Sequence, residues 1–105
     1  MTTAKELFDA MPDNFKPEKA AGLNATVQFN LSGDNGGTWA VKVADGKCTV
    51  TEGPAESPTL TISMDAADYV AMVKGDLPAM NAFMQGKIKL QGDMGLAMKF
   101  QNLFG

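Results

Sequence analysis

The stretch from residue 84 to residue 104 reads MQGKIKLQGDMGLAMKFQNLF and decides how this chain folds at its end. Ile88 and Leu90 alternate with polar residues, which is the period of a strand with one buried face. Gly92 ends that strand, and the carboxylate of Asp93 can accept a hydrogen bond from the first turn of a helix. The sequence therefore predicts a short strand that leads through a Gly-Asp turn directly into a last helix.

This last helix is apolar around most of its circumference. At about 100° per residue, its apolar side chains cover an arc of roughly 220°, about twice the stripe that a helix on one sheet needs. They are Met94, Leu96, Ala97, Met98, Phe100, Leu103 and Phe104. Gln101 falls inside the arc, where an unpaired buried amide costs about 1–3 kcal/mol and therefore requires a partner. The helix must bury two flanks, either as a plug that completes a small core or as a wall against an apolar ligand.

The rest of the chain predicts helices on either side of a run of strands. A capping box at Thr3-Ala4-Lys5-Glu6 and an apolar face from Ala4 to Met11 predict a helix that Pro12 ends. Asp65 and Asp76 are expected to cap two more helices before residue 84. Alternating apolar residues predict strands at 26–31, 38–43, 47–51 and 59–64, besides 87–91.

The turns between the first four strands favour an antiparallel meander with one apolar and one solvated face. The predicted fold is α+β: a five-stranded, mainly antiparallel sheet with helices covering one face. At 105 residues, the chain is long enough for a single domain over residues 1–105.

Composition excludes several classes of function. The nine basic residues are all lysines and the net charge is −3, which weighs against nucleic-acid binding because arginine is the preferred residue there. The single cysteine, Cys48, cannot form an internal disulfide and fits a reducing compartment. No apolar run reaches a membrane-spanning length, and the N-terminus lacks a signal-peptide pattern. We therefore expect a cytoplasmic protein.

The sequence offers no catalytic signature. It contains no histidine, which removes the usual general base, the Ser-His and Cys-His pairs and most transition-metal sites. Helix capping explains Asp65 and Asp68, and a turn explains Asp34. Tyr69 is expected to pack its ring inward rather than to transfer a proton. We predict no catalytic residue, no cofactor and no metal site.

The eight methionines are the remaining unusual feature, and six of them lie in the second half of the chain. Methionine is flexible and polarisable, so it suits surfaces that adapt to varied shapes. Together with Phe83, Phe100 and Phe104, these methionines favour an adaptable cavity, although a loosely specified core would use the same residues.

The run GKIKLQGDMGLAMKFQNL, residues 86–103, resembles the C-terminal signature of the sterol carrier protein 2 family, the non-specific lipid-transfer proteins. The order of predicted elements agrees with that family over nearly the whole chain. The resemblance implies a hydrophobic tunnel under the C-terminal helix that binds and carries fatty acids, fatty acyl-CoA, sterols or phospholipids.

The matching motif also implies which residues line that tunnel: Ile88, Leu90, Met94, Ala97, Met98, Phe100, Gln101 and Phe104. The apolar stripe before the motif adds Met80, Phe83 and Met84. Gln101 would orient an oxygen of the ligand. Lys87, Lys89 and Lys99 could give transient contact with a membrane surface or a CoA phosphate, although a solvated edge of the sheet explains them more simply.

Two other functions stay open. The chain could be a non-catalytic accessory or scaffold domain that supports a partner enzyme acting on hydrophobic substrates. A histidine-free enzyme ranks last, because no acid–base pair is visible. Peroxisomal members of the family end in a Ser-Lys-Leu-like tripeptide, whereas this chain ends Asn102-Leu103-Phe104-Gly105, so we expect a cytoplasmic rather than a peroxisomal location.

Overall fold

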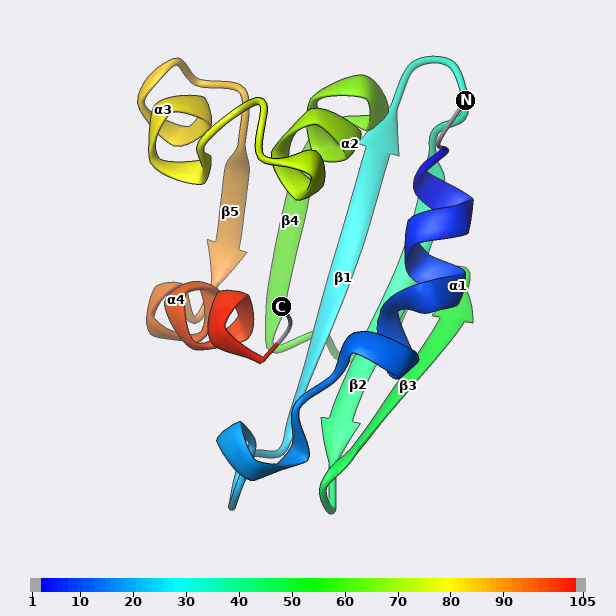
Figure 1. Cartoon of the computed structure of the whole chain (residues 1–105), viewed down its shortest axis with the longest axis vertical. Helices are drawn as coiled ribbons and strands as arrows, with labels where there is room; N and C mark the ends of the chain where they lie inside the picture. Colours follow the sequence, from blue (N-terminus) through cyan, green and yellow to red (C-terminus); the bar gives the residue numbers. More distant parts are fainter. Residues whose placement is uncertain (1–2, 104–105) are drawn as a thin grey trace.

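The computed structural model describes residues 3–103, apart from the side chains of residues 98, 101 and 102. Helices and strands follow one another in the order drawn in Figure 1. Their bounds are α1 (Ala4–Asn14), the 3-10 turn η1 (Pro17–Lys19), β1 (Ala25–Ser32), β2 (Gly37–Ala44), β3 (Lys47–Glu52), β4 (Leu60–Asp65), α2 (Ala66–Lys74), α3 (Ala79–Met84), β5 (Lys89–Gly92) and α4 (Met94–Asn102).

The five strands form one sheet in the order β3-β2-β1-β4-β5. Three of the neighbouring pairs are antiparallel, and β1 pairs with β4 in parallel. The predicted α+β fold with a mainly antiparallel five-stranded sheet is confirmed.

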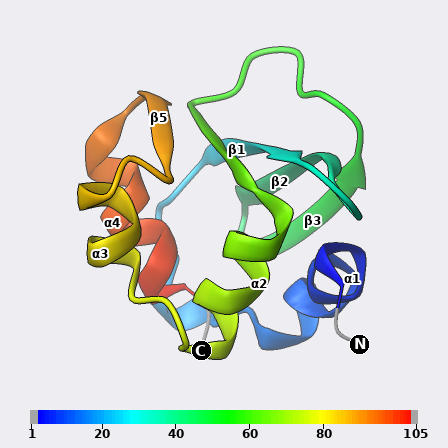
Figure 2. The same cartoon turned by 90° about the horizontal axis from the view of Figure 1, so that it is seen from above.

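The predicted meander of the first four strands is wrong, because β3 and β4 point the same way and cannot be joined by a hairpin. The connecting residues 53–59 cross the face of the sheet that the helices leave open, and Figure 2 shows this loop arching over the strands. The side-chain oxygen of Gln28 accepts a hydrogen bond from the Ala55 N–H at 3.0 Å. At the end of the loop, the Thr59 N–H donates to the Thr26 carbonyl at 2.7 Å.

The helices α1, α2 and α4 lie on the opposite face of the sheet (Figure 2). Strand alternation places one set of side chains under them, and this set forms the buried core: Val27, Phe29, Leu31, Trp39, Val41, Val43, Leu60, Ile62 and Met64. The intervening residues of the same strands stay partly exposed. The period-2 pattern of the sequence therefore identified the core face of the sheet correctly.

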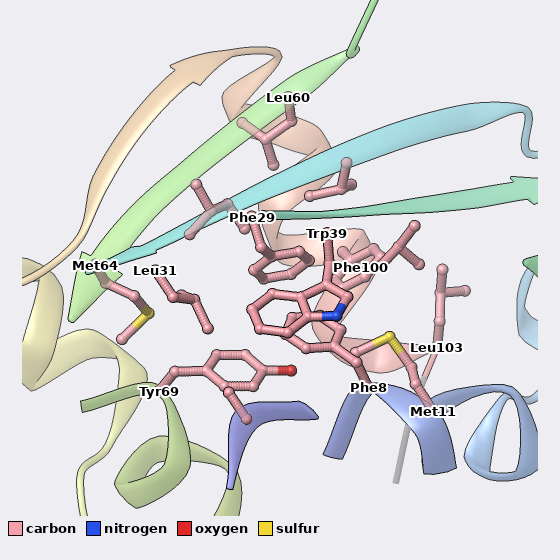
Figure 3. Packing of buried hydrophobic residues seen from close by; sticks show 14 of the residues in the cluster. Phe8, Met11, Phe29, Leu31, Trp39, Leu60, Met64, Tyr69, Phe100 and Leu103 are labelled. Carbon is pink, nitrogen blue, oxygen red and sulfur yellow. The ribbon is translucent and has the colours of Figure 1, made fainter. Parts of the chain in front are cut away.

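An aromatic cluster joins the helices to this face. The ring of Phe8 in α1 stacks on Trp39 with centroids 4.7 Å apart and on Tyr69 with centroids 5.0 Å apart. Phe29 meets the Phe8 ring edge-on at 5.1 Å. Figure 3 shows the three rings of Phe8, Trp39 and Tyr69 lying one against another. Tyr69 packs inward as the sequence predicted.

Three predicted helix caps are present. Thr3, Asp65 and Asp93 accept hydrogen bonds through their side chains from the Glu6, Ala67 and Leu96 N–H groups, at 3.3, 2.9 and 3.3 Å. Each cap satisfies a backbone donor that the first turn of a helix leaves unpaired.

Two predicted helix boundaries are wrong. The first helix continues past Pro12 to Asn14, so Pro12 lies inside its last turn and costs the helix one i→i−4 hydrogen bond. The third helix begins at Ala79, not after Asp76. Proline at 78 disfavours helical geometry at Leu77, and the N–H groups of residues 76 and 77 instead close α2 on the Ala71 carbonyl.

Replacing Phe8 with alanine should destabilise the protein by about 3–5 kcal/mol, because it removes the ring that α1 shares with β2 and α2. Urea denaturation followed by circular dichroism measures this change. The matched control is Met84→Ala on the exposed face of α3, for which we expect less than about 0.5 kcal/mol. Similar losses in both variants would contradict the central role of the Phe8 ring.

Candidate functional site

Strand β5 forms one edge of the sheet and carries the first predicted ligand-binding residues. Its register places Leu90 opposite Ile62 of β4 on the core face, and Lys89 opposite Ser63 on the other face. Leu90 is partly buried against the core, as is Ile88 just before the strand. The edge of the core under β5 is therefore apolar but incompletely covered.

The Gly92-Asp93 turn fixes the angle between β5 and α4. Gly92 has a φ of +114°, and a Cβ at this position would collide with the Thr59 carbonyl oxygen. The Asp93 N–H donates to that same oxygen at 3.0 Å, while the Asp93 carboxylate caps α4. The strand, turn and helix predicted from residues 84–104 are present, although β5 itself is limited to Lys89–Gly92. The carbonyl of Thr59, the residue just before β4, therefore holds this turn in place.

Among its described side chains, helix α4 contacts the core mainly through one stripe. Leu96, Phe100 and Leu103 are buried, one helical turn after another. The Phe100 ring lies 5.7 Å from the Phe29 ring, centroid to centroid. The Leu103 carbonyl accepts a hydrogen bond from the Lys16 N–H at 2.8 Å, which ties the end of the helix to the N-terminal segment.

A second flank of α4 is less covered. Met94 is 53% exposed, and Ala97 is only partly buried against the core. The predictions for the Met98 and Gln101 side chains and for Phe104 lie outside the described residues. Among the side chains that the structure describes, α4 thus buries one flank fully and leaves the other open at its N-terminal end.

Helix α3 carries the remaining predicted residues on an exposed surface. Met80 is 67% exposed, Phe83 49% and Met84 79%, whereas Ala82 of the same helix is fully buried. These three side chains do not reach the aromatic core. Figures 1 and 2 both show α3, β5 and α4 together on one side of the molecule, away from α1.

The structure therefore brings together part of the predicted set. Ile88, Leu90, Ala97 and Phe100 border the core under β5 and α4, whereas α3, which carries the exposed Met80, Phe83 and Met84, lies at the other end of β5 from α4 (Figure 1). Phe29 was missing from the predicted set, although it meets Phe100 directly. Alternation marks it as a core residue, but nothing local shows which helix it contacts.

Two hollows lie elsewhere on the described surface. One, of about 460 Å³, is lined by Asn30, Thr38, Ser63, Lys87 and Lys89, among others. The other, of about 350 Å³, lies between the segment after η1 and α4, and it is lined by Lys19, Ala21, Gly22, Leu23, Lys99 and Leu103. Neither is lined by a residue of the predicted tunnel, so the tunnel and its lining stay predictions.

The titratable side chains of the core are poorly suited to proton transfer. Burial raises the pKa of the Cys48 thiol to about 11 and raises the pKa of the Tyr69 hydroxyl well above its usual range. Over residues 3–103, no three His, Cys, Asp or Glu side chains gather closely enough to hold a metal ion. In that same range, no helix has the length and hydropathy needed to cross a bilayer.

Comparison with known proteins decides the family. The model of the SCP-2 sterol transfer family matches residues 4–105, nearly the whole chain. The chain belongs to this family. The family membership agrees with the resemblance of the motif at residues 86–103.

The chain is similar to part of a longer relative and to a solved structure of about its own length. Hydroxysteroid dehydrogenase-like protein 2 of Xenopus tropicalis is 35% identical over 102 residues, and this chain covers 24% of its length, so it spans about a quarter of that relative. The crystal structure of sterol carrier protein 2 like 2 from Aedes aegypti superposes with a TM-score of 0.77 at 28% identity, over 95% of this chain and 92% of that one.

The same fold also occurs as part of a larger protein. The stereoselective inverting sec-alkylsulfatase Pisa1 from Pseudomonas sp. matches with a TM-score of 0.85 at 22% identity. The match covers 98% of this chain and 16% of the sulfatase. At this identity the likeness establishes the fold alone.

The raised pKa values predict that the protein becomes less stable in alkali. The unfolded chain loses the Cys48 proton near its ordinary pKa of 9.0, whereas the folded chain keeps it until about pH 11. Over this range the unfolded state binds fewer protons, so the free energy of unfolding falls as pH rises, and Tyr69 adds to the fall from its ordinary pKa of 10.0 upwards.

Urea denaturation between pH 8 and pH 11 measures how steeply the free energy of unfolding falls with pH. The double variant Cys48→Ala/Tyr69→Phe should show a shallower decline than the unaltered protein, because neither replacement ionises. An identical decline in both proteins would show that other groups cause it.

Proposed function

We propose that this chain binds lipids and carries them, with the acyl or sterol part of the ligand held between β5 and α4. The observation that carries the proposal is the match to the SCP-2 sterol transfer family over residues 4–105. It is supported by the incompletely covered apolar side chains at the β5–α4 border, where Ile88, Leu90 and Ala97 are partly buried and Met94 is half exposed.

Transfer of apolar surface from water supplies the affinity. Each methylene group gains about 0.8 kcal/mol, so a chain of about twelve gains roughly 9–10 kcal/mol before the costs of binding. Ordering the ligand and removing its translational freedom takes back several kcal/mol, so an affinity of about micromolar requires a longer chain, of about fourteen to sixteen methylene groups. Apolar walls distinguish ligands weakly, so fatty acids, fatty acyl-CoA, sterols and phospholipids form one proposed substrate class.

The packing of α4 suggests how a tunnel forms. Three side chains, Leu96, Phe100 and Leu103, bury one stripe of this helix. A small displacement of the open flank, with methionine side chains changing rotamer, would admit an alkyl chain without disturbing the cluster around Phe8. We propose Gln101 as the polar group that orients an oxygen of the ligand.

We propose that any chemical reaction of the bound lipid is carried out by other proteins or by other domains. Among the described residues, the half-buried thiol of Cys48 and the buried phenol of Tyr69 both have raised pKa values, which makes them poor acids and bases near neutral pH. The Xenopus relative is about four times as long as the matched region, so a neighbouring catalytic unit is compatible with the same lipid-binding role. In that arrangement this domain would hold the hydrophobic substrate for a partner enzyme.

Long-chain fatty acids should displace a fluorescent fatty acid from the protein at micromolar concentrations and raise its melting temperature by several degrees, because they bind the folded state alone. Short-chain acids serve as controls and should do neither, since they bury too few methylene groups. Absence of displacement at tens of micromolar long-chain ligand would contradict the proposed function.

Replacing Leu90 with asparagine should weaken fatty-acid binding about tenfold or more, because it places an amide in the apolar wall under β5. The matched control is Val50→Asn in β3. Val50 is also partly buried, but it lies at the opposite edge of the sheet. Fluorescence titration compares the two variants, with circular dichroism to confirm folding. Equal losses in both would locate the ligand away from β5.

A further inference from the structure

The exposed apolar side chains of the described chain are confined to one region. The large ones are Val73, Met80, Phe83, Met84 and Met94, all between residues 73 and 94. Met80, Phe83 and Met84 follow the i, i+3, i+4 spacing and share one side of α3, and we call this set the α3 surface. By contrast, the apolar residues of α1 are buried in the core.

The fold does not require the α3 surface. Only Ala82 of this helix is buried, and the helix lies between Gly75 and Gly86, whose positive φ values of +88° and +75° set the turns at either side. Large apolar side chains that contribute nothing to folding on a solvent-facing helix indicate contact with another apolar phase.

Charge distinguishes this region from the rest of the molecule. Residues 73–103 contain four lysines and two aspartates, a net charge of +2, whereas the remaining residues carry −5. The α3 surface therefore lies in a cationic region of an acidic protein. This arrangement favours an anionic apolar partner over a second copy, because a two-fold contact through α3 would bring the same lysines together.

A hollow of about 460 Å³ adjoins α3 on the face of the sheet away from the helices. Thr38, Asn30, Ser63 and Lys89 form one row across four strands in its wall, because each is the register partner of the next. Gly86 and Lys87 complete the side nearest to α3.

The two lysines of this hollow are available to a ligand. Its acid, Asp65, is engaged in capping α2 through the Ala67 N–H at 2.9 Å. Lys87 lies 4.0 Å from Asp68, and both side chains are partly exposed, so this ion pair restrains the lysine weakly. Hydroxyl, amide and ammonium groups together suit the phosphate of a lipid headgroup.

We propose that the α3 surface and this hollow dock the protein on an anionic phospholipid membrane. The side chains of Met80, Phe83 and Met84 enter the boundary between headgroups and acyl chains, and Lys87 and Lys89 face the headgroups. The inference rests on the proposed lipid-carrying function and names the surface through which lipid would enter and leave.

Co-sedimentation with vesicles tests the proposal. The protein should bind phosphatidylcholine vesicles that contain about 30% phosphatidylserine, bind pure phosphatidylcholine weakly, and dissociate in about 0.5 M salt, because the screening length falls. Lys87→Gln/Lys89→Gln should weaken binding about 25-fold, about fivefold for each lysine. The matched control Lys42→Gln/Lys47→Gln makes the same change in net charge on exposed residues of β2 and β3 and should alter binding less than about twofold.

The apolar half of the docking surface is tested separately. Met80→Gln/Met84→Gln should weaken vesicle binding about tenfold or more with an unchanged circular dichroism spectrum, because both residues are exposed. Vesicle binding that is absent, or that both lysine pairs weaken equally, would overturn the proposal. So would a dimer, measured by analytical ultracentrifugation, that the methionine variant abolishes while vesicle binding is absent.

Fluorescent fatty-acid binding without vesicles separates the two proposals. If the unaltered protein binds the fatty acid but not anionic vesicles, the docking surface is wrong and the lipid-binding function stands. If the unaltered protein binds vesicles but not the fatty acid, the lipid-carrying function fails and the docking proposal falls with it.

Discussion

The stacking of Phe8 between Trp39 and Tyr69 is the interaction on which the rest of the structure depends. These rings come from α1, β2 and α2, so a single cluster holds two helices against the sheet. Phe29 extends the cluster to α4 by meeting both Phe8 and Phe100. Burial of flat rings on one sheet face gives a rigid half of the molecule, because aromatic side chains have few rotamers and large contact areas.

The other half of the molecule is built differently. In the part of the chain that the structure describes, one buried stripe attaches helix α4, the β5 edge is partly covered, and α3 exposes Met80 and Met84. The exposed side chains of this half include the flexible methionines Met80, Met84 and Met94. One half of the domain is tightly packed and the other is loosely covered. The loosely covered half can bind apolar ligands of different shapes while the tightly packed half keeps the domain folded.

Much of the fold and part of the candidate site could be predicted from the sequence. The caps at Thr3, Asp65 and Asp93 and the strand alternation are local, since the interacting groups are neighbours along the chain. The Gly92-Asp93 turn was predicted for the same reason. The prediction of a meander was wrong because the order of strands in a sheet depends on which distant strands pair. The helix start at Asp76 failed because Pro78 outweighed a capping signal.

By itself, the sequence determined which segments form strands and helices, apart from the end of α1 and the start of α3, which face of each strand is apolar, and the membership of the SCP-2 sterol transfer family. Only the tertiary structure decided that β4 lies parallel to β1, that Phe29 meets Phe100, and that α3 presents its apolar side to solvent. The physical reason is the range of the interactions. Periodicity and capping act within a few residues, whereas exposure of an apolar helix face depends on whether a distant part of the chain covers it.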